Sequence, residues 1–159
     1  MPRDRKGKRV LRVHPARASI AAAPAAGPET NAFQQHLLAP VHEEIVTLAA
    51  LEADWDSNAA EPPSNQAIAA AHLLVDEVGQ LLGQQLGDQV VPYDITPTPR
   101  GGVHVEWRGR DQRLQVEIGP ECNFRFLIKP LPPTGPAHGE AQRVALPDLL
   151  PQIAEVLLA

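Results

Sequence analysis

Polar side chains that could perform acid/base chemistry recur along the segment from Val103 to Ile128. Apolar and polar residues alternate there, so every second side chain of an extended strand would point to the same side. The polar set contains one histidine, two carboxylates and their basic or amide neighbours: His104, Glu106, Arg113, Gln115, Glu117 and Arg125. A histidine beside carboxylates is typical of general acid/base catalysis. Opposite charges on neighbouring strands also stabilise a sheet by about 0.2–1 kcal/mol per pair, and we favour this structural interpretation.

Two further groups resemble metal sites but lack an essential member. Residues 54–58, Asp-Trp-Asp-Ser-Asn, imitate the opening of a calcium loop, yet Ala59 replaces its glycine and Asn65 its final glutamate. His72 and Asp76 lie four residues apart on a predicted helix that offers no third ligand. We therefore expect loop-bonding carboxylates, a solvated His–Asp pair, and neither a metal nor a cofactor.

A single cysteine, Cys122, excludes an internal disulfide and a cysteine-based zinc site. A lone thiol suits a reducing cytoplasm. The sequence has no apolar run near the roughly 20 residues that a membrane helix needs, and no continuous apolar segment follows its basic start, as a secretory signal would require. These features predict a cytoplasmic protein without a membrane partner.

The N-terminal segment has the opposite charge from the rest of the chain. Residues 1–30 hold 7 basic and 2 acidic residues, a balance of +5, whereas residues 31–159 hold 7 basic and 17 acidic residues, a balance of −10. The basic residues of the first segment are Arg3, Arg5, Lys6, Lys8, Arg9, Arg12 and Arg17. Residues 20–28 are mostly Ala, Pro and Gly, so the composition predicts a disordered tail.

This tail has three open interpretations. Its cations could contact nucleic acid without sequence preference, or an acidic partner. It could instead be a solvated extension with no partner, or could precede the true start codon. Residues 1–30 contain no aromatic side chain, which argues against stacking on single-stranded bases.

Three short strands with a shared apolar face are predicted from the alternation between Val103 and Ile128. The apolar positions are Val103, Val105 and Trp107, then Leu114, Val116 and Ile118, then Phe124, Phe126 and Ile128. Short links rich in turn-forming residues make successive strands antiparallel neighbours. A preceding strand is expected at residues 90–95, where Pro92 would confine it to a sheet edge or a bulge.

Two helical segments are predicted before these strands. Residues 31–53 carry apolar residues at helical spacing, and Pro40 should begin the main helix or separate it from a short turn. Ser64 can cap a second helix that continues to about Gln85.

The C-terminal part combines an irregular connection with one helix. Residues 130–144 are rich in Pro and Gly, and a helix is expected at about Pro147–Leu158. Helices followed by strands, without βαβ alternation, predict a single α+β domain over residues 31–159. We expect two N-terminal helices packed on a three- to four-stranded antiparallel β-meander, with a C-terminal helix.

Two motifs resemble an uncharacterised group of small bacterial proteins. In that group a Trp-Asp loop precedes a proline and a helix, and a P-x-P-x-G-G turn precedes a strand ending in Glu-Trp. The corresponding residues here are Leu51, Trp55, Asp56, Ala60, Pro62 and Ser64, then Pro97, Pro99, Gly101, Gly102, Val103, Val105, Glu106 and Trp107. The resemblance covers roughly residues 45–128, and it implies a shared shape and a bacterial origin without implying a reaction.

The sequence as a whole favours a non-enzymatic protein–protein interaction module, an accessory protein of a bacterium. The alternative is a nucleic-acid-associated factor that uses the basic tail. A weaker alternative is a small enzyme on the polar sheet face, with His104, Glu106, Glu117 and Arg125 as its candidate site. The sequence contains no nucleophile elbow and no phosphate-binding loop that would strengthen the enzyme hypothesis.

Overall fold

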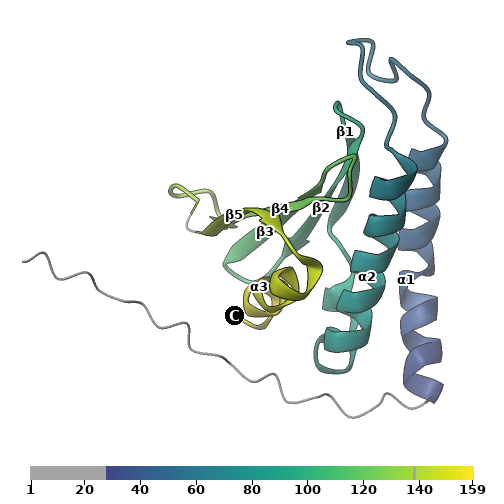
Figure 1. Cartoon of the computed structure of the whole chain (residues 1–159). Helices are drawn as coiled ribbons and strands as arrows, with labels where there is room; N and C mark the ends of the chain where they lie inside the picture. The colour runs from purple at the N-terminus through teal and green to yellow at the C-terminus, as the bar shows by residue number, and fades with distance from the viewer. Residues whose placement is uncertain (1–27, 138) are drawn as a thin grey trace, which may run out of the picture.

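The computed structural model describes residues 28–137 and 139–159, so the predictions for the basic tail lie outside the described residues. Figure 1 shows the order of the elements. They are α1 (Pro28–Ala49), α2 (Asn65–Leu86), the 3₁₀ helix η1 (Gly87–Val90), β1 (Asp94–Thr98), β2 (Gly102–Arg108), β3 (Gln112–Ile118), β4 (Phe124–Pro130), β5 (Gly139–Val144) and α3 (Leu146–Leu158). The predicted α+β class is confirmed.

The strands form one antiparallel sheet in sequence order, β1-β2-β3-β4-β5. The register aligns Val105, Val116 and Phe126 across the three central strands. All nine predicted apolar residues of these strands are at most 8% exposed, which confirms their shared inward face. Trp107 is completely buried, and its indole N–H donates to the Val90 carbonyl at 3.0 Å.

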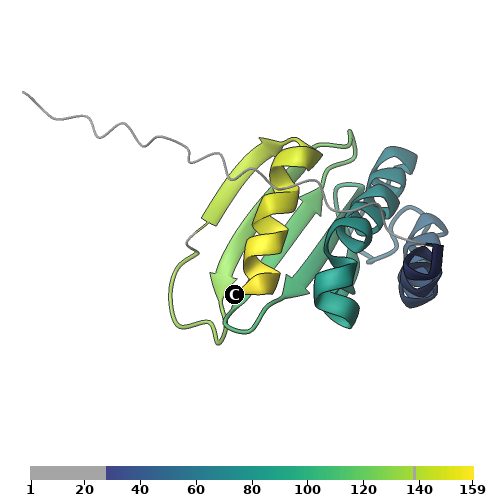
Figure 2. The ribbon, with the colours of Figure 1, turned by 90° about the horizontal axis from the view of Figure 1, so that it is seen from below.

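Helices α2 and α3 cover the apolar face of the sheet, whereas α1 packs on α2 at the periphery (Figure 2). Helix α2 packs on β2 and β3, whereas α1 reaches the sheet only at β1, which corrects the prediction that both helices pack on the sheet alike. Helix α3 contacts β2, β3 and β4, and so takes the place that a second N-terminal helix would need. Helices α1 and α2 approach closely at Gly79 and Gly83, where an added Cβ would meet Leu38 and Gln34.

Among the described residues, no helix combines the length and the apolar character needed to cross a membrane.

Helix α1 runs unbroken through Pro40, contrary to the prediction that the helix begins or divides there. Proline removes one backbone hydrogen bond, but the apolar residues Leu38, Val41 and Ile45 continue across it and are buried. Packing against α2 therefore outweighs the local cost of the proline.

The first strand lies four residues later than predicted. Val90 belongs to η1, and β1 contains Pro97 instead of Pro92. The expectation of an edge strand still holds, because β1 pairs with β2 alone. Proline has no N–H to donate, and on an edge strand it can face away from the neighbouring strand.

A fifth strand occupies part of the segment that was predicted to be an irregular connection. Strand β5 has no fully buried side chain, and Ala141 and Val144 are its only apolar residues. The period-2 apolar signal that identifies β2, β3 and β4 is therefore missing from β5.

Ser64 joins the start of α2 to two turns of the sheet. Its hydroxyl accepts from the Ala67 N–H at 3.0 Å, as the predicted cap, and donates to the Pro120 carbonyl at 2.6 Å. Its own N–H donates to the Gly101 carbonyl at 2.9 Å. One residue thus fixes where α2 begins relative to the β1–β2 and β3–β4 turns.

The loop before Ser64 is held by its own carboxylates. The Asp54 carboxylate accepts from the Ala59 N–H at 2.7 Å, and the Asp56 carboxylate accepts from Asn58 and Ala60 at 2.8 and 3.2 Å. These bonds confirm the expected backbone-bonding role of the calcium-like segment.

Replacing Gly109 with alanine should loosen the packing of α3 on the sheet. An added Cβ would collide with the backbone carbonyl of Val156 in α3, which cannot rotate away. We expect Gly109→Ala to lower the free energy of unfolding by about 1–3 kcal/mol in urea denaturation. Gly135→Ala is the matched control, because nothing lies within 4 Å of its Cβ, and it should change stability by less than about 0.5 kcal/mol. Equal effects of the two substitutions would contradict this packing.

Candidate functional site

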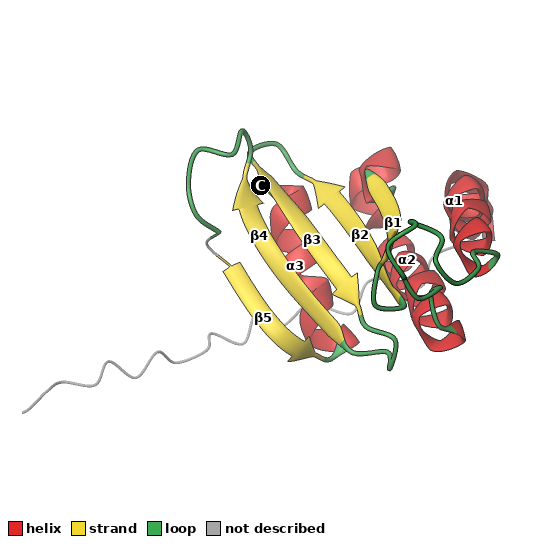
Figure 3. Ribbon diagram, turned by 90° about the horizontal axis from the view of Figure 1, so that it is seen from above, coloured by secondary structure: helices red, strands yellow, loops and turns green. Residues whose placement is uncertain are grey.

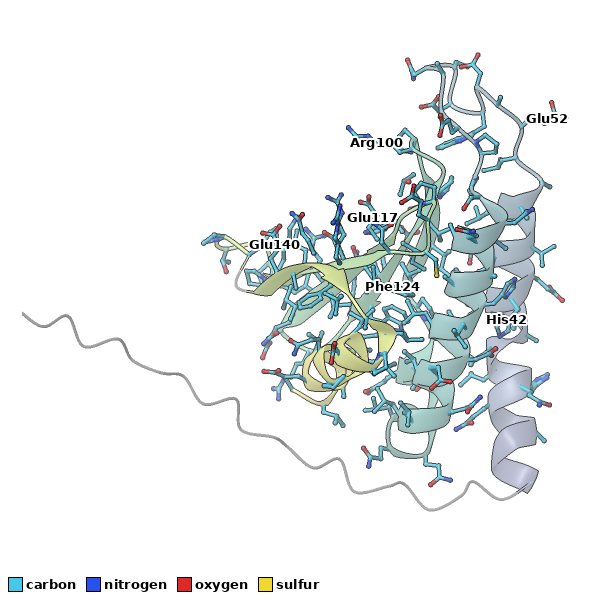
Figure 4. The ribbon with its side chains drawn as sticks, viewed as in Figure 1. His42, Glu52, Arg100, Glu117, Phe124 and Glu140 are labelled. Carbon is cyan, nitrogen blue, oxygen red and sulfur yellow. The ribbon has the colours of Figure 1, made fainter. Side chains whose placement is uncertain are left out.

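The sheet has a second face, here called the outer face, that carries the alternate side chains of all five strands. Figure 3 looks onto this face, and no described helix crosses it. Figure 4 shows Glu117 and Glu140 on this side of the sheet and Phe124 on the opposite side. The four candidate site residues predicted on the sheet all belong to the outer face by their register: His104, Glu106, Glu117 and Arg125.

Glu106 is the best-connected carboxylate of the outer face. It accepts from Arg108 Nε at 2.6 Å and from Gln115 Nε2 at 3.0 Å, and Arg113 Nη1 lies 3.9 Å away. The residue is only 5% exposed although it points away from the apolar core. The long side chains of its neighbours therefore shield it from water.

The same neighbours set the protonation state of Glu106. Burial opposes the charged form, but the hydrogen bonds from Arg108 and Gln115 and the charges of Arg108 and Arg113 outweigh it. Together they hold the pKa of Glu106 below its ordinary value of 4.5. A general base or acid near neutral pH requires the opposite shift, so this carboxylate is suited to structural pairing.

A shallow hollow of about 170 Å³ lies beside this network. Its polar lining includes His104, Gln115, Glu117, Arg125 and Glu140, and Leu127 is a half-buried apolar residue in it. Glu117 forms an ion pair with Arg125 on the next strand. The predicted cross-strand pairing of opposite charges is therefore present on the outer face.

The charges of the outer face balance. Its acidic side chains are Asp94, Glu106, Glu117 and Glu140, and its basic side chains are Arg108, Arg113, Arg125 and Lys129, as the strand register places them. A surface that binds nucleic acid is dominated by basic residues. This face lacks such an excess.

A histidine pair on the helices was missed by the sequence analysis. His42 of α1 places its Nδ1 2.7 Å from His72 Nδ1, and its Nε2 2.9 Å from the Asp76 carboxylate (His42 is labelled in Figure 4). His42 of the neighbouring helix therefore bridges His72 and Asp76, which corrects the predicted direct pair. No sequence spacing could reveal it, since 30 residues separate the two histidines.

The contact between the rings is a hydrogen bond that needs a proton on one nitrogen only. The rings are nearly parallel, 21° apart, but 2.7 Å is shorter than the roughly 3.5 Å at which stacked atoms rest. Burial and the nearby His42 lower the pKa of His72 below its ordinary 6.5, and Asp76 offsets part of this effect. If both Nδ1 atoms carried a proton, two N–H groups would face each other, and this hydrogen bond between α1 and α2 would be lost.

The remaining described side chains that could ligate a metal or react as a thiol lie apart from one another. Within residues 28–137 and 139–159, no three His, Cys, Asp or Glu side chains are grouped to hold a metal ion. Cys122 is an exposed free thiol in the β3–β4 turn.

Comparison of the chain with family models, curated proteins and solved structures found no match.

Replacing Glu106 should cost more stability than replacing Glu117. Glu106→Gln removes a buried charge that faces the exposed Arg108 and the half-buried Arg113, and we expect a loss of about 1–3 kcal/mol at pH 7. Glu117→Gln is the matched control, because its more exposed pair with Arg125 should contribute only about 0–1 kcal/mol.

The acid dependence gives a second readout for Glu106. Since its folded pKa is depressed, its stabilisation is present above pH 4.5 and is lost as the pH falls through the lower folded value. The Glu106→Gln variant should therefore show a shallower loss of stability in acid. Parallel acid profiles for wild type and variant would contradict the network.

The histidine pair should make stability fall on mild acidification. Because the folded pKa of His72 is lowered, its contribution is complete above 6.5 and decreases as the pH falls below that value. His72→Asn keeps a donor towards His42 but cannot titrate, so thermal unfolding of this variant should depend less on pH between about 7 and 5. His36→Asn, on the exposed side of α1, should retain the wild-type profile. An unchanged profile in His72→Asn would exclude the proton-sharing contact.

Proposed function

We propose that the protein is a non-enzymatic interaction module that binds a protein partner through the outer face of its sheet. The observation that carries this proposal is the one-sided arrangement of the described helices, which leaves a continuous five-stranded surface uncovered. The bacterial origin and the cytoplasmic location favoured by the sequence belong to the same proposal.

The chemistry of the outer face supports binding over catalysis. Both carboxylates that could act as acid or base, Glu106 and Glu117, are already bound to arginine side chains. Arginine is also common at protein interfaces, where its planar group forms several hydrogen bonds at once. A hollow around Leu127 offers a place for an apolar anchor of the partner.

The balanced charges favour a protein partner over a nucleic acid at this face. Four acidic side chains among four basic ones would repel a uniformly negative polymer locally. A protein can present a complementary mixture of both signs, which fixes orientation and excludes wrong partners.

The size of the face suggests a transient complex. Five strands at a spacing of about 4.8 Å, each about 20 Å long, give roughly 500 Å² of projected area. A standard stable interface buries about 800 Å² on each partner. We therefore expect a transient complex, unless the partner also contacts the loop before Ser64.

Site-specific photo-crosslinking in the source organism tests this proposal. A benzoylphenylalanine at Leu127 should give a discrete adduct with one protein, because the side chain points into the hollow. The same group at Glu155, on the exposed side of α3, is the matched control and should give none. The adduct at position 127 should also disappear when Arg125→Glu reverses a neighbouring charge. Equal adducts at both positions, or a nucleic-acid adduct at Leu127, would overturn the proposal.

A further inference from the structure

The segment that contains α1 and α2 is charged with one sign only. Residues 28–99 contain eleven Asp and Glu residues and no Lys or Arg. The first cation after the tail is Arg100, at the β1–β2 turn. The excess negative charge of residues 31–159 is therefore concentrated in α1, in α2 and in the loop that joins these two helices.

A groove of about 650 Å³ runs between α1 and α2. It is lined by Glu43 and Asp76 together with His42 and the amide side chains of Gln34, Gln35 and Gln80. Both carboxylate residues are exposed, so their charges face an occupant of the groove through water or directly. The groove is thus acidic, rich in hydrogen-bonding groups and free of any cation of its own among the described residues.

Gln34 of α1 lines part of the groove, and the end of its side chain lies against Gly83 of α2. The residue is only 5% exposed, yet its Nε2 has no hydrogen-bond partner among the described atoms. A buried amide without a partner typically costs about 1–3 kcal/mol. This nitrogen is fully buried against α2, so it belongs to the contact between the two helices and is not open to the groove.

The chain itself carries a segment of matching chemistry. Residues 1–27 hold seven basic residues and one acidic residue, a balance of +6, and lead directly into α1 at Pro28. Val10, Leu11 and Val13 lie among these cations, and Leu38 and Ala39 are apolar residues of the groove lining. Both the charge and the apolar content of the two surfaces are therefore complementary.

The connection is long enough for the basic residues to reach the whole groove. Ten residues separate Arg17 from Pro28, and an extended chain spans about 3.3–3.6 Å per residue, or roughly 35 Å. The 22 residues of α1 extend over about 33 Å. A tether of this length also gives a millimolar effective concentration, so even a weak contact would be populated.

We propose that residues 3–17 dock in cis on the acidic groove between α1 and α2. The cations would lie against Glu43 and Asp76. This assigns the basic tail an intramolecular partner, and it is independent of the role proposed for the outer face.

Paramagnetic relaxation in the full-length chain tests the docking. A nitroxide is attached to Ala16→Cys in a Cys122→Ser background, so that only the tail carries the label. At low salt, amide signals of residues lining the groove should lose most of their intensity, whereas those of the outer face should be unaffected. At about 1 M salt, where screening acts within about 3 Å, the groove signals should recover.

Two isosteric double variants separate charge from fold. Glu43→Gln with Asp76→Asn neutralises the groove while keeping an acceptor for His42, and should weaken the relaxation effect several-fold. Asp111→Asn with Glu121→Gln removes the same charge from exposed turns of the sheet and should leave the effect intact. Relaxation of the outer face in place of the groove, or equal effects of the two double variants, would overturn the proposal. If the groove signals relax only when spin-labelled chains are mixed with unlabelled ones, the tail docks on a second copy of the chain and not in cis.

Discussion

The nine apolar side chains of β2, β3 and β4 all point to one face of the sheet, because side chains alternate with period two along a strand. Each of them contributes about 1.5–3 kcal/mol when it is removed from water, so the sheet is stable only where that face is covered. Helices α2 and α3 must therefore both lie on the same side. The outer face stays uncovered by any described helix, and its polar side chains pair with one another.

The junction at Ser64 determines how α2 meets this sheet. The residue caps the helix and bonds two separate turns of the meander, so the start of α2 is fixed at three points. The Glu61 N–H adds a bond to the Pro99 carbonyl at 3.0 Å beside it. The loop that contains Trp55 and Asp56 thus ends beside the turn at residues 97–102.

Much of this arrangement could be predicted from local patterns. Alternation identified the central strands, and the Ser64 cap identified the start of α2, because both signals depend on neighbours in sequence. Strand β5 was not predicted because it buries few apolar side chains. The continuation of α1 through Pro40 was not predicted because packing against α2 outweighs the local cost of the proline. The residues of the polar face were predicted correctly from the alternation. The burial of Glu106 could not be predicted, because it depends on where the long side chains of Arg108 and Arg113 lie. The link from His42 to His72 joins two helices through residues far apart in sequence, and no single-segment pattern contains it.

The central claim is that the sheet is covered on one face only, and hydroxyl-radical footprinting tests it most directly. Leu127 and Ile128 are neighbours on β4 and have similar side chains, but they point to opposite faces. Each oxidation rate is compared with the rate of the same residue in the urea-unfolded chain, which removes the difference in intrinsic reactivity. We predict that Ile128 is strongly protected in the folded protein and that Leu127 is oxidised at a substantial fraction of its unfolded rate. Equal protection of the two residues would show that the outer face is covered, and would contradict the account.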